Sequence, residues 1–524
     1  MNRFIITLSS LALIFTSCEL DINDNPNYPD SGTISADLVF PNAQLGLVAT
    51  ISDNMFNYAG FFAQYFNQLP ESQQFDAISE NRINVSDQVF DGAYRTLYSG
   101  VLADLEDVKK KTNSTADLLA VAVLRTMSFQ LLVDNTDKTP YIESLGGNET
   151  PNPKYDDGDV VYKGVLAELD EALSAYKTNS EPMTVTDMMF GKNMTQWVGL
   201  ANAVKLRMYM RMYEKDNSVK DKIVALVNDN DFFMGDAALD IFADVPGNRS
   251  PFYASYYELG QANHCASYPI IQYMLHTDDP RIEYCFNKAT ADGKYVGEIP
   301  GAKNVTKEWV GSENWKNKNV SNVNYKLHNG TGATRPGIIF TQANLQFLIA
   351  EAKLRFLNDE AGAKVAYEDA IKADFATRFS SYKKNENSNT CTCTCGCEDC
   401  ICSQNSVVNV DVFLAGEYVN FDLAENKLEL IYMQKWAAFC YTDHMEAWSE
   451  IRRTDVPKLS TKDGKSIFET PSIYTPGELI DPVRNSIVGG GLVKRLPYSY
   501  KSYTINQNAP EAVEINVPVW WDVK

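Results

Sequence analysis

Apolar side chains recur at helical spacing through most of this 524-residue chain. One such stripe consists of Phe90, Tyr94, Leu97, Val101 and Leu105. Three lysines, residues 109–111, follow it, and cations at this position suit the negative end of a helix dipole. Residues 118–133 are apolar nearly all round, which is typical of a buried helix. A chain patterned in this way can bury its stripes only by packing helix against helix.

The helical stripes follow one another in pairs. They recur in residues 162–176, 197–213, 345–356, 363–375 and 428–447. Since short turns separate some of them, each helical hairpin would bury its faces against the next pair. We therefore predict a mainly α fold of tetratricopeptide-like helical hairpins. The strict consensus of that repeat is absent, so an irregular helical bundle is the alternative.

Composition divides the chain into six parts. They are residues 1–17, a signal peptide; 18–34, a tether; 35–230, a helical part; 231–340, a loop-rich part; 341–460, a second helical part with a cysteine-rich insertion at 388–406; and 461–524, an irregular C-terminal part. The two irregular parts are rich in Gly, Asn, Pro and aromatic residues, which predicts long loops with a few short strands. Because binding groups lie disproportionately on loops held by a rigid scaffold, we expect a ligand site in residues 231–340.

The N-terminus has the pattern of an export signal. Arg3 precedes an apolar run, residues 4–15, and small residues then lead to Cys18. This apolar run is too short to span a bilayer. The segment resembles a bacterial lipobox, so we predict cleavage before Cys18 and acylation of its thiol, which would anchor the protein stably to a membrane. A soluble secreted protein in which Cys18 is incidental is the alternative.

The charge of the chain argues against one class of partner. It has 68 acidic and 47 basic residues, a formal net charge of -21. This is the wrong sign for a protein whose affinity comes from neutralising phosphates, so we expect no nucleic-acid partner.

The sequence contains no motif that indicates catalysis or a cofactor. It has no His-Glu-x-x-His, no Gly-x-Ser-x-Gly and no dinucleotide-binding glycine fingerprint. Glu446 and Glu450 would share one helix face, and glycoside hydrolysis does need two carboxyl groups. Arg452 and Arg453 follow them directly, which favours a structural ion-pair network over catalysis. We therefore predict a protein that is not an enzyme, with a helical glycosidase as the less favoured reading.

Six cysteines cluster in one short segment. They are Cys391, Cys393, Cys395, Cys397, Cys400 and Cys402. Thiolates at this density could bind a soft metal ion such as Zn(II) or Cu(I). In an exported protein they could instead pair as disulfides within a hydrophilic insertion. Both readings stay open, and the second is favoured because no distant His or Cys pattern completes a metal site.

Several segments together resemble the SusD/RagB family of outer-membrane nutrient-binding lipoproteins. Besides the lipobox and tether, they are FQLLVDNTDKTPYIESL, PKYDDGDVVYKGVLAELDEAL, RPGIIFTQANLQFLIAEAKLRF, AYEDAIKADF, LELIYMQKWAAFCYTDHMEAWSEIRRTDVPKL and NAPEAVEINVPVWWD. The resemblance implies a helical, non-catalytic protein, lipid-anchored at the surface of the outer membrane. It also implies an oligosaccharide or peptide ligand and a SusC-like TonB-dependent transporter as partner.

Loops that carry both aromatic and polar residues are candidates for sugar binding. Flat C–H faces of sugar rings stack on aromatic side chains, and sugar hydroxyls exchange hydrogen bonds with amide and carboxylate groups. The candidates are Trp309, Trp315, Tyr325, Phe75 and Asp76. Trp197, Trp436 and Trp448 lie on helical stripes, so we expect them in the core. A peptide-capturing or purely scaffolding repeat protein is the rival interpretation, and fewer exposed aromatic residues would favour it.

Overall fold

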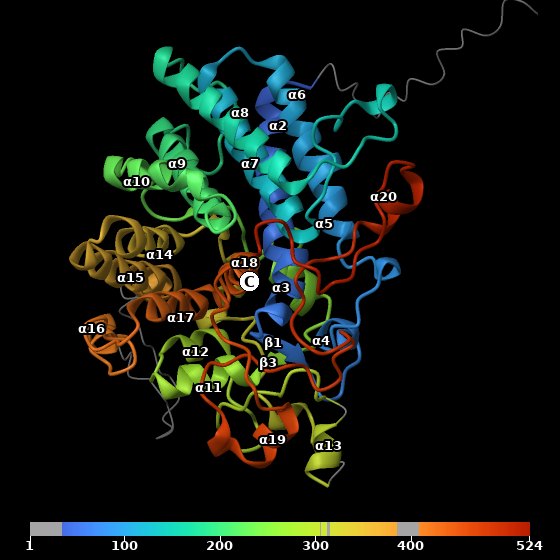
Figure 1. The fold of residues 1–524 in the computed structure, drawn as a ribbon, viewed down its shortest axis with the longest axis vertical. Helices are drawn as coiled ribbons and strands as arrows, with labels where there is room; N and C mark the ends of the chain where they lie inside the picture. The colour runs from blue at the N-terminus through green and yellow to red at the C-terminus, as the bar shows by residue number, and fades with distance from the viewer. Residues whose placement is uncertain (1–33, 304, 312–314, 385–407) are drawn as a thin grey trace, which may run out of the picture.

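The computed structural model describes residues 34–303, 305–311, 315–384 and 408–524. Cys18, the tether and the six clustered cysteines lie outside the described residues. Within the described part the chain is mainly helical with few short strands, so the predicted fold class is confirmed. Figure 1 shows the helical pairs following one another from the top of the molecule down its left-hand side.

The first helical pair is formed by two long, interrupted helices. One consists of α2 (Ala36–Thr50), the π-helical η3 (Ile51–Met55) and α3 (Phe56–Phe62). The other consists of α5 (Asp91–Arg95), the π-helical η5 (Thr96–Leu102) and α6 (Ala103–Lys111), and it packs on α2 through η5 and α6. The three lysines predicted to end this second helix form the last turn of α6.

The remaining hairpins complete the helical part. Their helices are α7 (Thr115–Thr136) with α8 (Gly158–Thr178), α9 (Met194–Met212) with α10 (Lys220–Asp229), α14 (Gln342–Ala352) with α15 (Glu360–Lys384), and α17 (Lys427–Phe439) with α18 (His444–Thr454). The π-helical η11 (Lys353–Leu357) extends α14, and α16 (Val410–Leu414) packs on α15. Trp197, Trp436 and Trp448 are only 0%, 3% and 1% exposed, so their predicted core positions are confirmed.

The helix α7 lies at the centre of the first hairpins. Ser114 caps its N-terminus by accepting a hydrogen bond from the backbone N–H of Asp117, as the capping pattern of the sequence indicates. Among the described helices α7 alone is long and apolar enough to cross a membrane, yet 89% of its most apolar window is buried inside the molecule. It is a core helix of the fold.

A buried ion-pair network joins the helical hairpins. Glu446 and Glu450 of α18 lie within it: Arg211 Nη2 is 2.6 Å from Glu446 Oε1, and Lys435 Nζ is 2.9 Å from Glu450 Oε2. Burial by itself raises the pKa of Glu450, but Arg453 and Lys435 outweigh this effect and hold the pKa below its ordinary value. The two carboxylates therefore lie in a buried ion-pair network, in which Arg207 and Arg211 of α9 pair with Glu446 and the neighbouring Arg453 pairs with Glu450.

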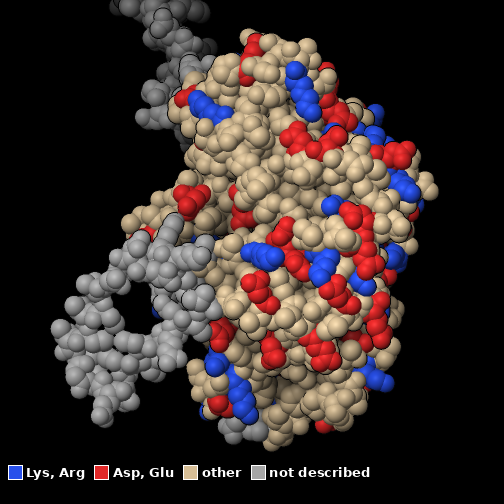
Figure 2. All heavy atoms as spheres, turned by 90° about the vertical axis from the view of Figure 1, so that its left-hand side faces the viewer, with Lys and Arg blue, Asp and Glu red and all other residues tan. Residues whose placement is uncertain are grey.

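Most of the loop-rich chain lies in the lower half of the molecule in Figure 1, but the helix α20 (Tyr500–Ile505) of the C-terminal part lies in the upper half, at the right. Strand β1 (Phe66–Gln68) pairs antiparallel with β3 (His264–Ala266), and β2 (Ala237–Leu239) pairs antiparallel with β4 (Gly337–Phe340). Short helices complete this half and the C-terminal part: α4 (Asp76–Ser79), α11 (Tyr268–His276), α12 (Arg281–Cys285), α13 (Thr306–Trp309), α19 (Gly464–Glu469) and α20 (Tyr500–Ile505). Figure 2 shows Lys and Arg interspersed with Asp and Glu over one face of the molecule.

Candidate functional site

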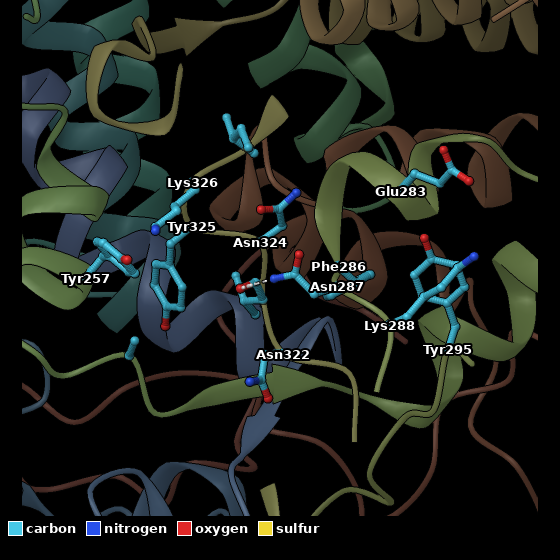
Figure 3. A pocket seen from close by; sticks show the side chains of 13 residues that line it. Tyr257, Glu283, Phe286, Asn287, Lys288, Tyr295, Asn322, Asn324, Tyr325 and Lys326 are labelled. Carbon is cyan, nitrogen blue, oxygen red and sulfur yellow. Dashed lines mark hydrogen bonds between the residues drawn. The ribbon is translucent and has the colours of Figure 1, made fainter. Parts of the chain in front are cut away.

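A hollow of about 730 Å³ lies within the loop-rich part. Three segments form its walls: the end of the π-helical η8 (Tyr253–Glu258), the chain from α12 to Tyr295, and residues 322–327. Figure 3 shows tyrosine and lysine side chains at both ends of the hollow and asparagines between them. The hollow thus combines aromatic, amide and charged groups within residues 231–340, where the sequence places the ligand site.

Tyr257, Tyr325 and Lys326 form one end of the hollow (Figure 3). The rings of Tyr257 and Tyr325 have their centroids 6.1 Å apart. The Nζ of the exposed Lys326 lies 5.3 Å from the centroid of Tyr257. Interaction with the Tyr257 side chain raises the pKa of this ammonium above its ordinary value, so the group is a cation at neutral pH.

A buried histidine fixes the position of Tyr325. His264 Nε2 donates to Asn57 Oδ1 at 2.6 Å, which leaves Nδ1 to accept a hydrogen bond from the Tyr325 hydroxyl. Burial lowers the pKa of His264 to about 3, so the ring stays neutral in this role. Tyr325 is only 5% exposed and serves as a rigid wall of the hollow.

Tyr295, Lys288 and Glu283 form the opposite end (Figure 3). Lys288 Nζ lies 5.5 Å from the centroid of the half-buried Tyr295 ring. Burial raises the pKa of Tyr295 to about 12, and the carboxylate of Glu283 contributes in the same direction. This end therefore carries charges of both signs beside an aromatic ring.

Three asparagines lie between the two ends. A strand-like pairing positions them, because the N–H of Asn287 donates to the carbonyl of Asn322 at 2.8 Å and the N–H of Asn324 donates to the carbonyl of Cys285 at 2.9 Å. The side chains of Asn287 and Asn322 are exposed, and each amide has donors and an acceptor for a ligand, although Asn287 Nδ2 also donates to the carbonyl of Val323 at 3.5 Å. Tyrosine faces at the ends and amides between them suit a sugar chain better than an ion or a cofactor.

Of the residues predicted from the sequence, Tyr325 alone lines this hollow. The ring of Phe75 stacks on His264 with centroids 4.3 Å apart and is 5% exposed, so it lies behind the wall. The carboxylate of Asp76 is 2.9 Å from Lys303 Nζ in an ion pair at the start of α4. Both residues support the surroundings of the hollow.

Trp309 and Trp315 come together at a different place. Their rings lie 5.3 Å and 6.1 Å from the ring of Phe468 in α19. Trp315 Nε1 donates to the buried Glu298 at 2.7 Å. Each tryptophan is only partly buried, and neither lines the hollow.

Sequence reasoning missed Tyr257, Tyr295, Lys288 and Lys326. The sequence did carry a signal for three of them, because Lys288, Tyr295 and Lys326 lie in loops near amide or charged residues, as in Asn324-Tyr325-Lys326, whereas Tyr257 lies in η8. Among the described residues that line the hollow, Glu283 is the single carboxylic acid, so the pair of carboxyl groups that glycoside hydrolysis needs is not assembled there.

A stack of helical hairpins that presents a tyrosine- and amide-lined hollow on its loops defines a ligand-binding protein. Comparison with protein families makes this more specific: residues 27–472 match the SusD-like family described as “Starch-binding associating with outer membrane”. The chain belongs to this family, as its resemblance to SusD/RagB proteins indicated. A comparison with proteins of curated function gave no match.

Solved structures share the fold over nearly the whole chain. A SusD homolog from Bacteroides uniformis ATCC 8492 is 21% identical, with a TM-score of 0.67 over 93% of this chain and 100% of that one. A SusD/RagB family protein from Bacteroides thetaiotaomicron VPI-5482 is 16% identical, with a TM-score of 0.69 over 94% and 99%. A chitin-binding protein is 18% identical, with a TM-score of 0.66 over 94% and 100%. At these identities the similarity establishes the fold.

Proposed function

We propose that this protein is a cell-surface lipoprotein that binds an oligosaccharide in the hollow and delivers it to a SusC-like TonB-dependent transporter. The observation that carries the proposal is the pair of tyrosine-bearing ends, Tyr257 with Tyr325 and Tyr295, separated by asparagines. Aromatic faces bind sugar rings and amides bind their hydroxyls. The family description, which joins starch binding to the outer membrane, supports the same function.

The protein binds its ligand without cleaving it. Glu446 and Glu450 are held in ion pairs by buried cations, and the hollow itself has a single carboxylic acid. Incubation with mixed plant and host polysaccharides should therefore release no reducing ends. Release that disappears in Glu446→Gln or Glu450→Gln would favour a glycosidase instead.

Replacement of the tyrosines tests the binding site. Tyr257→Ala and Tyr295→Ala should each weaken glycan binding, since a stacked aromatic contact contributes about 0.5–1.5 kcal/mol beyond its buried area. Isothermal titration with an oligosaccharide that the wild type retains on a glycan array measures the change. Tyr418→Ala is the matched control, because Tyr418 is 49% exposed and lines no part of the hollow.

The same titration separates the alternatives. Unchanged affinity in both hollow variants would exclude this hollow as the site. A loss confined to a Trp309→Ala, Trp315→Ala double variant would instead place the sugar at the two tryptophans. Binding of peptides but of no glycan would establish the peptide-capturing reading, which the three tyrosines of the hollow disfavour.

A further inference from the structure

Each end of the hollow carries a lysine for which the described part of the chain supplies no carboxylate partner. Lys326 Nζ lies 5.3 Å from the ring centroid of Tyr257, and Lys288 Nζ lies 5.5 Å from that of Tyr295. No carboxylate oxygen of a described residue is within 4.0 Å of either ammonium group. Both side chains are exposed, so their charges are available to a ligand.

Neighbouring cations are already neutralised. Arg249, next to Tyr253, pairs with Asp244 at 2.8 Å and with Glu258 at 2.7 Å. Lys303 pairs with Asp76 at 2.9 Å. The described lining of the hollow has two lysines and one carboxylate, so it carries one net positive charge in a chain with a net charge of -21.

The two ends differ in charge. At the Tyr295 end the negative charge of Glu283 balances the positive charge of Lys288. At the Tyr257 end the described lining residues include Lys326 and no carboxylate. The ammonium of Lys326 lies 5.3 Å from the centroid of the Tyr257 ring, and this side chain raises its pKa. An anionic group bound at the hollow is therefore attracted most strongly to the Tyr257 end.

We propose that the hollow selects an acidic oligosaccharide, whose carboxylate or sulfate group pairs with Lys326 while its sugar ring stacks on Tyr257. This inference rests on the proposed function and adds the class of glycan. A ring stacked on Tyr257 has its substituents within reach of the ammonium group, which is 5.3 Å from the ring centroid. A charge-assisted pair of this kind discriminates against the neutral sugar.

The aromatic surface continues beyond the hollow. The half-exposed Tyr253 has its ring centroid 4.9 Å from that of Tyr257, so three tyrosine rings follow one another from Tyr253 to Tyr325. Adjacent sugar units can contact the partly exposed rings of Tyr253 and Tyr257. The surface therefore suits a chain of sugars rather than a single acidic monosaccharide.

Two matched pairs of probes test the proposal by isothermal titration: an oligogalacturonate with its carboxyl-reduced form, and a sulfated galactan oligomer with its desulfated form. The acidic member of at least one pair should bind about tenfold more tightly than its neutral form at low salt, and added salt should reduce the difference. Which pair shows the effect identifies the anionic group. Lys326→Gln should remove the preference, so that the acidic and neutral members of the pair bind with equal affinity.

The control is Lys177→Gln, which removes the same charge from α8, a helix that lines no part of the hollow. Thermal melting of both variants verifies that they fold. Equal binding of acidic and neutral forms, or a preference that survives Lys326→Gln, would overturn the acidic-ligand inference and leave glycan binding intact. Absence of binding to all four probes and to a neutral glycan array would overturn the inference together with the proposed function.

Discussion

Glu298 is a carboxyl group that the fold buries almost completely, with 1% of its surface exposed. Its oxygens accept hydrogen bonds from Thr306 Oγ1 and Trp315 Nε1, both at 2.7 Å. Burial nevertheless dominates and raises the pKa from 4.5 to about 7. Because the unfolded chain loses this proton at a lower pH than the folded protein, the contribution of Glu298 to stability is fully present below 4.5 and is lost as the pH rises through 7.

Glu298→Gln should therefore change the pH dependence of stability. As the pH rises through this window, the wild type should lose about 1.36 kcal/mol of unfolding free energy per pH unit relative to the variant, which has no carboxyl group at this position. Denaturant unfolding of both proteins from about pH 4 to about pH 8 measures the difference, and the comparison of slopes removes any constant offset of the variant. Parallel stability profiles would show that Glu298 titrates normally.

The residue scale is also where the sequence is least informative about the site. Tyr325 and Phe75 both occur in loop segments with polar neighbours, yet one lines the hollow and the other stacks behind it on His264. The position of Tyr325 depends on the pairing of residues 285–287 with 322–324, and that of Phe75 depends on His264 in β3. Local pattern does not encode a contact between segments this far apart in sequence.

At the scale of elements, buried ion pairs connect helices of different hairpins. Glu351 of α14 accepts two hydrogen bonds from the Arg453 guanidinium of α18, at 2.8 Å and 2.6 Å. Burial by itself raises the pKa of Glu351. The attraction of Arg453 outweighs this effect, so the pKa lies below its ordinary value. The carboxylate is therefore ionised inside the core, where its charge depends on this partner.

Glu351→Gln should destabilise the protein by about 3–5 kcal/mol, because it leaves the Arg453 side chain buried with an incomplete charge balance. Urea unfolding measures the loss. Glu368→Gln is the control, since Glu368 forms only longer pairs near the surface, such as that with Lys372 at 3.8 Å. Equal, small effects of both replacements would show that the buried network contributes little to stability.

The positions and ends of many helices could be predicted from the sequence. Apolar periodicity located most of the helices, and Ser114 and the three lysines at residues 109–111 marked helix ends that the structure confirms. The periodicity did not mark α2 or α10, and the single stripe at residues 428–447 spans two helices, α17 and α18. The π-helical segments η3, η5 and η11 were not foreseen. They keep the helices continuous while shifting the apolar face, and no residue type marks such an insertion.

At the scale of the whole molecule, we predict that the N-terminus determines where the protein acts. We predict acylation at Cys18, with residues 19–34 as the tether to the folded part. Cys18→Ala should release the protein from the membrane fraction and abolish labelling by a radioactive fatty acid, because the tether itself has no apolar stripe. Ser17→Ala, which keeps a small residue before the cysteine, should remain anchored. Retention of label by the Cys18 variant would contradict the lipoprotein assignment.

The family and its fold could be predicted because many weak segments occur in a shared order along the chain, and the family match over residues 27–472 confirms this prediction. The ligand could not be predicted in the same way. Its recognition depends on a few exposed side chains, such as Lys326, which contribute little to folding and leave no periodic pattern. The cysteine-rich insertion at 388–406 stays a prediction, with disulfides and metal binding as its two readings.

Hydrogen exchange with and without a bound oligosaccharide tests most directly whether the loop hollow is the ligand site. Binding should slow exchange in residues 253–258, 285–296 and 322–327, which form or adjoin the hollow, and leave α8 and α10 unchanged. Protection confined to the helical hairpins, or to the segment with Trp309 and Trp315, would show that the sugar binds elsewhere.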